Sequence, residues 1–353
     1  MCKEQKLFYH DPLHDPLYHY CGLQTFYSII KNKSIWLSDL SKTNDSMELV
    51  WMKECVEKPL LAIVNSKSDS YSDEWNGWRV TKELLEHAGE DMRCWGFCLS
   101  EKGDDLGQWR GYGDDGAGVS IGFKYDKLNE LLKPQLDQSA VKVSSEDSEE
   151  DLGVELNFGK VQYKTREEIT EPISQEAKKR IDDDVISSIE DNVNSNRIKG
   201  RPPVKFTGEQ IEILARESLS KWFMGKEYFC KMKAFEEEDE WRIVFSLPVE
   251  KISPEVLKEK ISKKEFFDEK SQYFKDFKCF SDKFYPENYE YIVKDNMLVS
   301  HLEIKLKDLK DLIHSITIGP KSKVTEEDIK LFLKLNDVYS DSIVIGKSGA
   351  SYR

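Results

Sequence analysis

The chain has 353 residues, with 52 lysine and arginine residues against 66 aspartate and glutamate residues, so its formal net charge is −14. This excess of negative charge disfavours general binding to nucleic acid or anionic membrane, and any polyanion contact would need a local basic patch. No stretch has the ~18 uninterrupted apolar residues of a membrane span, and none is typical of a signal peptide. Seven cysteines, scattered through apolar segments, predict reduced thiols and a cytoplasmic protein.

The first part of the chain predicts an alternation of strands and helices. Residues 17–21 alternate in the manner of a strand, with His19 on the same face as two apolar neighbours. Apolar residues then recur at helical spacing over residues 23–30, and residues 34–40, "SIWLSDL", predict a second strand. Residues 43–52 have the composition of a loop that enters a helix.

Two helix starts are indicated by capping residues. Asp45 and Glu48 are spaced as the N-cap and N3 residues of a helix, which lets each side chain satisfy a free backbone amide. Thr325 and Asp328 have the same spacing and predict a second, weaker capping box near the carboxyl end of the chain.

The middle of the chain contains a glycine-rich connector between two predicted strands. The strands are residues 94–100, "CWGFCLS", and 116–123, "GAGVSIGF", and the connector is "EKGDDLGQWRGYGDDG". Residues 143–153 are acidic and polar, which predicts a mobile loop. Strand character returns at residues 154–163, "VELNFGKVQY".

The later part of the chain predicts a helical insertion followed by more strands. Residues 166–223 are helical and highly charged, and strands are predicted at 241–247, 301–306, 315–320 and 342–346. Strands therefore dominate both ends of the chain, which favours an α+β fold. We expect a single elaborated domain over residues 1–353. Its parts are a β-rich core at about 17–163 and 226–353 and a mostly helical insertion at about 164–225.

The acidic segment "FEEEDEWRIVF" is the strongest local signal for chemistry. Read as a strand, it directs Trp241 and its apolar neighbours to the core, and Glu238, Glu240 and Arg242 to the opposite face. Two carboxylates and a guanidinium in one row can polarise a hydroxyl, stabilise a cationic transition state or bind a metal ion. The alternative is a solvated strand edge whose charges neutralise one another.

The connector and the first strand add aromatic and imidazole groups. Trp109 and Tyr112 are three residues apart, so one helical turn would place both rings on one side, where a flat ligand could stack. Both rings could equally anchor the connector to the core. His19 could hydrogen-bond a sugar hydroxyl as a neutral imidazole, or it could be a satisfied core residue.

Several short segments, taken in order, resemble a bacterial and phage family known as domain of unknown function 2971. The matching segments are "LYHYCG", "IWLSDLSKTNDSMEL", "FCLS", "QWRGYGDDGAGVSIGF", "VQY", "KMKAFEEEDEWRIV", "ITIGP" and "SGASYR". They extend from Leu17 to Arg353, and their order and spacing carry the resemblance. Phe235 stands where the family often has tryptophan.

The layout of these segments is also similar to the ADP-ribosyltransferase fold, in which a first-strand histidine, a mid-chain aromatic residue and a late glutamate meet at NAD. The resemblance implies a split, mixed β-sheet core with NAD as co-substrate, and it assigns the three positions to His19, Tyr112 and Glu240. Glu240 would stabilise the oxocarbenium-like centre that forms when the nicotinamide–ribose bond breaks. Glu238 would orient or deprotonate the acceptor.

The same resemblance implies the remaining contacts to NAD. His19 would hold a ribose, Tyr112 or Trp109 would stack on the nicotinamide, and Arg242 or Lys231 would neutralise the pyrophosphate. The expected catalytic residues are Glu240 and Glu238, and no metal is expected. The expected NAD-binding residues are His19, Tyr20, Ser38, Trp109, Tyr112, Lys231 and Arg242.

Three functions stay open at this point. The first is an ADP-ribosyltransferase, or an NAD glycohydrolase if water is the acceptor, with a role as a toxin or in phage defence. The second is a non-catalytic nucleotide-binding or protein-interaction module that docks partners through the helical insertion. The third is a metal-dependent hydrolase that uses Glu238 and Glu240. The acceptor could be a protein, a small molecule or, through a basic patch at residues 197–205, a nucleic acid.

Overall fold

The computed structural model describes residues 16–43, 47, 49–65, 92–136, 155–180, 227–248, 286–294, 296–306 and 308–352. The chain divides into two compact units, which are described separately. The first unit comprises residues 1–42, 94–161 and 236–353, and the second comprises residues 43–93 and 162–235.

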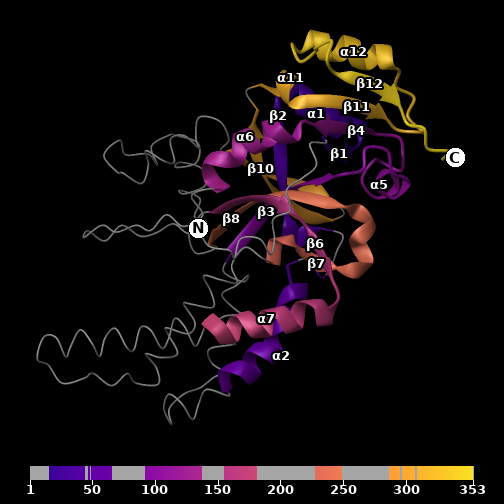
Figure 1. The fold of residues 1–353 in the computed structure, drawn as a ribbon. Helices are drawn as coiled ribbons and strands as arrows, with labels where there is room; N and C mark the ends of the chain where they lie inside the picture. Colours follow the sequence, from indigo (N-terminus) through magenta and orange to yellow (C-terminus); the bar gives the residue numbers. More distant parts are fainter. Residues whose placement is uncertain are drawn as a thin grey trace, which may run out of the picture. The chain divides into compact units, whose positions relative to one another are not determined.

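A 10-stranded sheet forms the centre of the first unit (Figure 1). Along its main path the strand order is β12-β11-β4-β1-β3-β2-β10-β9, and β8 and β5 branch from β3. The β11–β12 pair is parallel, and the other strand pairs whose register is known are antiparallel. The strands are β1 (Leu17–Cys21), β2 (Ser34–Asp39), β3 (Met92–Ser100), β4 (Val119–Phe123), β5 (Glu155–Lys160), β8 (Glu240–Pro248), β9 (Pro286–Lys294), β10 (Met297–Lys305), β11 (Ile313–Ile318) and β12 (Val344–Lys347).

The sheet forks at β3, which has β1, β2 and β8 as neighbours. β1 pairs with β3 at Ser100, whereas β2 pairs with it at Gly96 and Trp95. Backbone groups of alternate residues point to the same edge of an antiparallel strand, so Ser100, Cys98 and Gly96 share the edge where β1 and β2 diverge. Cys98 therefore lies between the two registers, at the fork.

One face of the sheet is apolar and buried. Alternating side chains of the strands gather there, among them Leu37, Trp95, Ile121, Ile243 and Leu302. Helices cover this face with the apolar side of each, including residues of α1, α6, α11 and α12. These helices are α1 (Leu23–Asn32), α6 (Tyr125–Leu136), α11 (Leu309–Leu312) and α12 (Glu326–Leu335).

A short helix and two 3-10 helices precede or follow strands of the large sheet. The helix α5 (Leu106–Gly111) follows β3, and η2 (Leu40–Lys42) follows β2. The 3-10 helix η5 (Lys233–Glu238) leads into β8. Asp105 caps α5 through a hydrogen bond that its side chain accepts from the amide of Gln108.

The second unit combines two helices with a small sheet. Its elements are α2 (Trp51–Asn65), α7 (Arg166–Arg180), η4 (Glu227–Phe229), and the parallel pair β6 (Gln162–Lys164) and β7 (Cys230–Met232). Arg166 joins the helices, because its guanidinium donates to the carbonyl of Glu54 and lies over the ring of Trp51. None of the helices in the described ranges is long and apolar enough to span a membrane.

The mixture of helices with a mostly antiparallel sheet confirms the α+β class expected from the sequence. The expected capping box at Thr325 and Asp328 is present at the start of α12. Strands β7 and β9 and helices α5, α6 and α11 were not predicted. Asp45, Glu48, the acidic loop at 143–153, the patch at 197–205 and most of the expected helical insertion lie outside the described residues.

Candidate functional site

The face of the sheet opposite the apolar core carries polar residues from five strands. The strand registers and the period of two place these side chains on one face. They are Tyr18 and Tyr20 on β1, Trp36 and Ser38 on β2, Cys98 and Ser100 on β3, Glu240 and Arg242 on β8, and His301 and Glu303 on β10. We refer to this surface of the first unit as the polar face.

The acidic segment is not a continuous strand. It consists of a turn at Glu237–Asp239, called the acidic turn below, followed by a strand. Glu238 is the last residue of η5, and β8 begins at Glu240. Between them, Asp239 has φ 42°, in the left-handed region that non-glycine residues rarely adopt. The expectation that Glu238 and Glu240 are neighbours on one strand face is therefore wrong, because the strand starts only after this turn.

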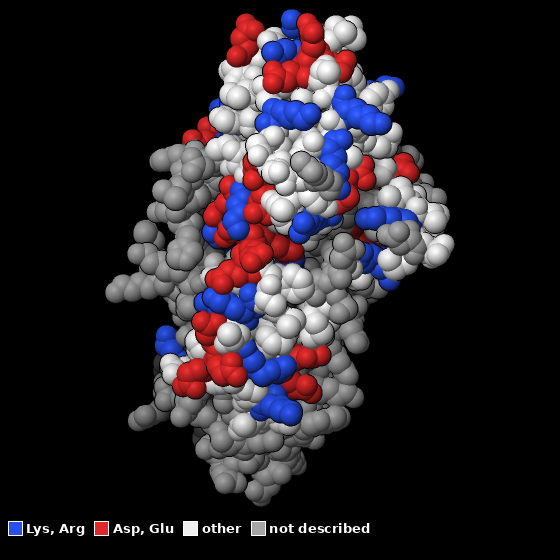
Figure 2. Space-filling view, turned by 90° about the vertical axis from the view of Figure 1, so that its right-hand side faces the viewer, with Lys and Arg blue, Asp and Glu red and all other residues white. Residues whose placement is uncertain are grey.

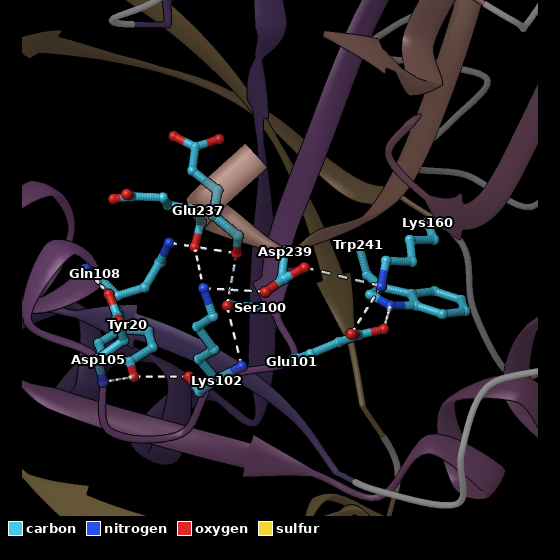
Figure 3. Close-up of polar contacts among 11 residues, drawn as sticks. Tyr20, Ser100, Glu101, Lys102, Asp105, Gln108, Lys160, Glu237, Asp239 and Trp241 are labelled. Carbon is cyan, nitrogen blue, oxygen red and sulfur yellow. Dashed lines mark hydrogen bonds and ion pairs between the residues drawn. The ribbon is translucent and has the colours of Figure 1, made fainter. Parts of the chain in front are cut away.

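The turn is bound to the end of β3 and to the connector that follows it (Figure 3). Ser100 Oγ donates to the carbonyl oxygen of Glu238 at 2.7 Å. The backbone amide of Glu101 donates to the carbonyl oxygen of Asp239 at 3.0 Å. Lys102 Nζ reaches both the carbonyl oxygen of Glu237, at 2.7 Å, and the carboxylate of Asp239, at 3.0 Å. These contacts fix the turn against β3, and the sequence did not indicate them.

A second group of contacts joins the connector to β1. Tyr20 Oη donates to the carbonyl oxygen of Lys102 at 2.7 Å and accepts from the backbone amide of Asp105 at 3.0 Å. Burial raises the pKa of the Tyr20 hydroxyl, so it stays protonated. Tyr20 is thus an anchor of the connector, and the ring of Trp109 packs edge-on against it at 4.7 Å.

The two aromatic candidates of the connector lie in different environments. Trp109 is fully buried and its Nε1 donates to Asp104 Oδ1 at 2.7 Å, so its faces are packed within the protein. Tyr112 ends α5 with its side chain exposed, and its hydroxyl donates to Glu238 Oε1 at 2.8 Å. Tyr112 is therefore the ring that a ligand can reach, paired with a carboxylate.

Glu240 and Arg242 form a buried ion pair on the polar face. Arg242 Nε donates to Glu240 Oε1 at 2.7 Å, and Nη2 donates to Oε2 at 3.0 Å. Glu240 is 5% exposed and Arg242 is 1% exposed. A bidentate guanidinium holds the carboxylate in its charged form and in one orientation.

His19 lies at the fork, with its side chain on the apolar side of β1. Its Nδ1 donates to the carbonyl oxygen of Cys98 at 2.9 Å, and its ring stacks on Phe97 at 4.2 Å. Burial lowers the pKa of His19 to about 4, so the imidazole is neutral at pH 7. The side chain therefore occupies the position where β1 and β2 leave β3.

Ser38 and Lys231 are two further candidates, one in each unit. Ser38 Oγ lies 3.0 Å from Nδ1 of His301, a residue that the sequence did not single out. Lys231 belongs to the second unit, where it is buried and its ammonium lies 5.5 Å from the centroid of the Phe235 ring.

Residues 348–352, the carboxyl-terminal segment, form hydrogen bonds with the connector, although the two are far apart in the sequence. Asp104 accepts hydrogen bonds from Ser348 Oγ at 2.6 Å and from the amide of Gly349 at 2.8 Å. Tyr352 donates its hydroxyl to Asp115, and Lys321 Nζ lies 3.8 Å from the centroid of the same tyrosine ring. The connector is thereby tied to β1, to the acidic turn and to this segment.

The described surface carries both signs of charge. Figure 2 shows acidic and basic side chains interspersed on the face that it draws. Ion pairs between side chains of the described surface include Lys321–Asp115 and Lys127–Glu130. Within the described residues, no group of three or more histidine, cysteine, aspartate or glutamate side chains is arranged to hold a metal ion.

One comparison with known proteins identifies a family. Residues 108–243 match the family described as "Protein of unknown function (DUF2971)", which confirms the family resemblance of the sequence motifs. The matched range contains Trp109, Tyr112 and the acidic turn, whereas His19 and Ser38 precede it. No curated protein and no solved structure matched the chain.

Proposed function

We propose that this member of the DUF2971 family is an NAD-dependent ADP-ribosyltransferase whose carboxylates are Glu238 and Glu240. One observation carries the proposal. Ser100, at the end of β3, pairs with β1 through its backbone and binds the acidic turn through its hydroxyl. Segments that are distant in the sequence are thus neighbours at one point, and this supports a shared site for the groups they carry.

The polar groups near this point suit the parts of NAD. Breaking the nicotinamide–ribose bond leaves its electron pair on nicotinamide and develops positive charge on the ribose, which a fixed carboxylate stabilises. Arg242 holds Glu240 in one orientation, and we assign to this fixed carboxylate the stabilisation of the ribose cation. The exposed ring of Tyr112 is suited to stacking on nicotinamide.

Glu238 is suited to the acceptor side of the reaction. Its carboxylate is partly exposed and accepts a hydrogen bond from Tyr112. In the proposed transfer, the acceptor's nucleophile attacks the ribose carbon, and Glu238 takes the proton that the nucleophile loses. His19 has a different role in this proposal. It fixes the fork through the carbonyl of Cys98 and does not hold a ribose.

Incubation with NAD labelled in the adenylate part, in the presence of cell lysate, tests the proposal. Wild-type protein is expected to transfer label to a macromolecule or, with water as acceptor, to release labelled ADP-ribose. Two substitutions at accessible side chains test the assigned residues. Glu238→Gln should lower the rate by roughly 10²-fold or more, and Tyr112→Phe should lower it by about tenfold.

Glu237→Gln is the matched control, because Glu237 is exposed, adjacent to Glu238 and bound to Lys102 only through its carbonyl oxygen. The control should keep the wild-type rate. Absence of both transfer and ADP-ribose release from folded wild-type protein, across lysates that supply different acceptors, would sink the proposal. Equal rates for Glu238→Gln and Glu237→Gln would remove Glu238 from it.

One observation favours a second function, a nucleotide-binding module without turnover. Both oxygens of Glu240 are engaged by Arg242, and the pair is buried, which suits binding and orientation more than proton transfer. Calorimetry that detects NAD binding, combined with no turnover under any acceptor condition, would favour this alternative.

A further inference from the structure

His301, on β10, is a buried histidine with a ring nitrogen that has no hydrogen-bond partner. The residue is 7% exposed, and its Nε2 is buried and unpaired within the described part of the chain. Its other ring nitrogen, Nδ1, lies 3.0 Å from Ser38 Oγ on the adjacent strand. Burying such a group without a partner destabilises a fold, so native proteins rarely keep one without a reason.

The surroundings of His301 define what kind of group could pair with its Nε2. The ring of Trp36 lies 5.1 Å from that of His301 and is only half-buried, so it offers an accessible flat surface. Burial, and then the charge of Lys294, lower the pKa of His301, so its ring is neutral at pH 7. A neutral imidazole beside an indole and a hydroxyl is suited to a flat, uncharged ring with a hydrogen-bonding edge.

The carboxylate of Glu303 argues against an anion beside Trp36. Glu303 lies on the same face of β10 and pairs across the strands with Trp36. Its carboxylate accepts hydrogen bonds from Ser34, at 2.7 Å, and from Lys305, at 2.8 Å, which keep it charged. A phosphate would meet this carboxylate, whereas a nucleobase would not be repelled by it.

The strand register gives the distance along β3 between Ser38 and the acidic turn. Ser38 pairs with Gly96 of β3, four residues before Ser100, which binds the turn. Four residues of strand span roughly 13 Å, a separation that an extended dinucleotide can bridge. Ser38 and Ser100 both belong to the polar face.

We propose that Trp36, Ser38 and His301 form a subsite for the adenine ring of NAD. The inference rests on the proposed function, since that function places the nicotinamide end at Tyr112 and leaves the adenine end unassigned. Trp36 stacks on the base, and the free nitrogen of His301 hydrogen-bonds its edge, with Ser38 orienting the imidazole.

Calorimetry on the full chain tests this subsite with four ligands: NAD, ADP-ribose, AMP and nicotinamide mononucleotide. His301→Leu and Trp36→Leu should each weaken binding of the three adenine ligands by about tenfold, which corresponds to the loss of one buried hydrogen bond or stacking contact. Binding of nicotinamide mononucleotide should stay unchanged. Glu290→Gln is the control, because Glu290 is exposed and lies opposite His301 on β9.

A purely structural role of His301 predicts a different pattern. His301→Leu removes an unpaired buried nitrogen together with the bond to Ser38, so these effects offset and the urea midpoint should change little, whereas a residue needed only for folding would lower it clearly. Unchanged affinity for AMP in both variants would overturn the adenine assignment while leaving the proposed function intact. Equal weakening of nicotinamide mononucleotide would also overturn it. If folded wild-type protein binds none of the four ligands, the proposed function itself fails.

Discussion

His19 at the fork and Trp109 in the connector are buried side chains whose polar atoms form hydrogen bonds inside the protein. His19 belongs to a strand face built for burial, and a leucine there would pack as well but could not bind the carbonyl oxygen of Cys98. The sequence left two roles open for this imidazole, a sugar contact or a satisfied core residue, and in the structure its Nδ1 binds a backbone carbonyl. Trp109 is a similar case, because its indole nitrogen and ring are both satisfied inside the protein.

The neutral state of His19 predicts a loss of stability in acid. Its pKa is about 4 in the folded chain, below the ordinary 6.5, because burial disfavours the charged form. The unfolded chain therefore binds a proton first, and the stabilisation present above pH 6.5 is lost as the pH falls towards 4. Between pH 7 and 4.5 this contributes about 2 kcal/mol to the free energy of unfolding.

Urea unfolding of wild type and His19→Gln at the two pH values isolates that contribution. Glutamine can donate to the same carbonyl but does not titrate, so the wild type should lose about 2 kcal/mol more than the variant on acidification. Parallel losses in both proteins would mean that His19 is charged or solvated in the folded state.

The Glu240–Arg242 pair predicts an asymmetry between single and double substitutions. Glu240→Gln removes the bidentate carboxylate from a buried guanidinium, which should cost about 3–5 kcal/mol of the free energy of unfolding. Replacing both residues, as Glu240→Leu with Arg242→Met, should cost less than the single change, since both charges of this pair are then removed together. Chemical denaturation compares the three proteins. A single variant as stable as the wild type would mean that water or another partner reaches Arg242.

At the scale of elements, the start of β8 depends on one unusual backbone conformation. Asp239 has φ 42°, and its carbonyl oxygen accepts from Glu101 while its carboxylate binds Lys102. The left-handed conformation costs about 1–2 kcal/mol for a residue with a Cβ, and less for asparagine or glycine. The turn separates Glu238 from the strand that carries Glu240, so it also sets the relative directions of the two carboxylates.

The stability of Asp239 variants should follow the ease with which each residue adopts the left-handed conformation. Asp239→Ala and Asp239→Gly both delete the carboxylate, so their difference reports the conformation alone, and the alanine variant should be about 1 kcal/mol less stable. Asp239→Asn should lie close to the glycine variant. Thermal or urea unfolding measures the order, and equal stabilities of the alanine and glycine variants would show that the turn relaxes without cost.

The pattern of the sequence predicted elements whose signal is local. The alternation at residues 17–21 and the capping pair Thr325–Asp328 both appear as expected, because each depends on neighbours in the chain. The break after Glu238 was missed, since hydrophobic alternation from Trp241 onward carries no information about where pairing with β3 begins. His301 was missed because its significance depends on Ser38, which lies 263 positions away in the sequence.

At the scale of the whole chain, long-range pairing assembles the proposed site. β3 pairs with β1, β2 and β8. Residues 348–352 form hydrogen bonds with a connector that lies more than two hundred positions earlier in the sequence. Such contacts follow from topology, which a single sequence does not encode in any local pattern. The family match covers the acidic turn and the part of the connector from Gln108 onward, because it extends over residues 108–243.

The returning segment predicts that the end of the chain controls the order of the connector. Removing the residues after Lys347 deletes the bonds from Ser348 and Gly349 to Asp104 and the bond from Tyr352 to Asp115. Asp104 then keeps only the indole of Trp109 as a described side-chain partner, so α5 should open more often. Hydrogen exchange of the amides of residues 106–118 should become about tenfold faster, while exchange in β10 should not change.

Tyr352→Phe refines this prediction, since it keeps the ring beside Lys321 and Arg110 but removes the hydroxyl that binds Asp115. A smaller acceleration, confined to residues near Asp115, is expected for this variant. Because Tyr112 and its contact to Glu238 follow directly on α5, faster opening should lower the NAD turnover that we propose, in proportion to the fraction of time that the connector is open. Unchanged exchange in the truncated protein would mean that Tyr20 and the acidic turn order the connector without help from the end of the chain.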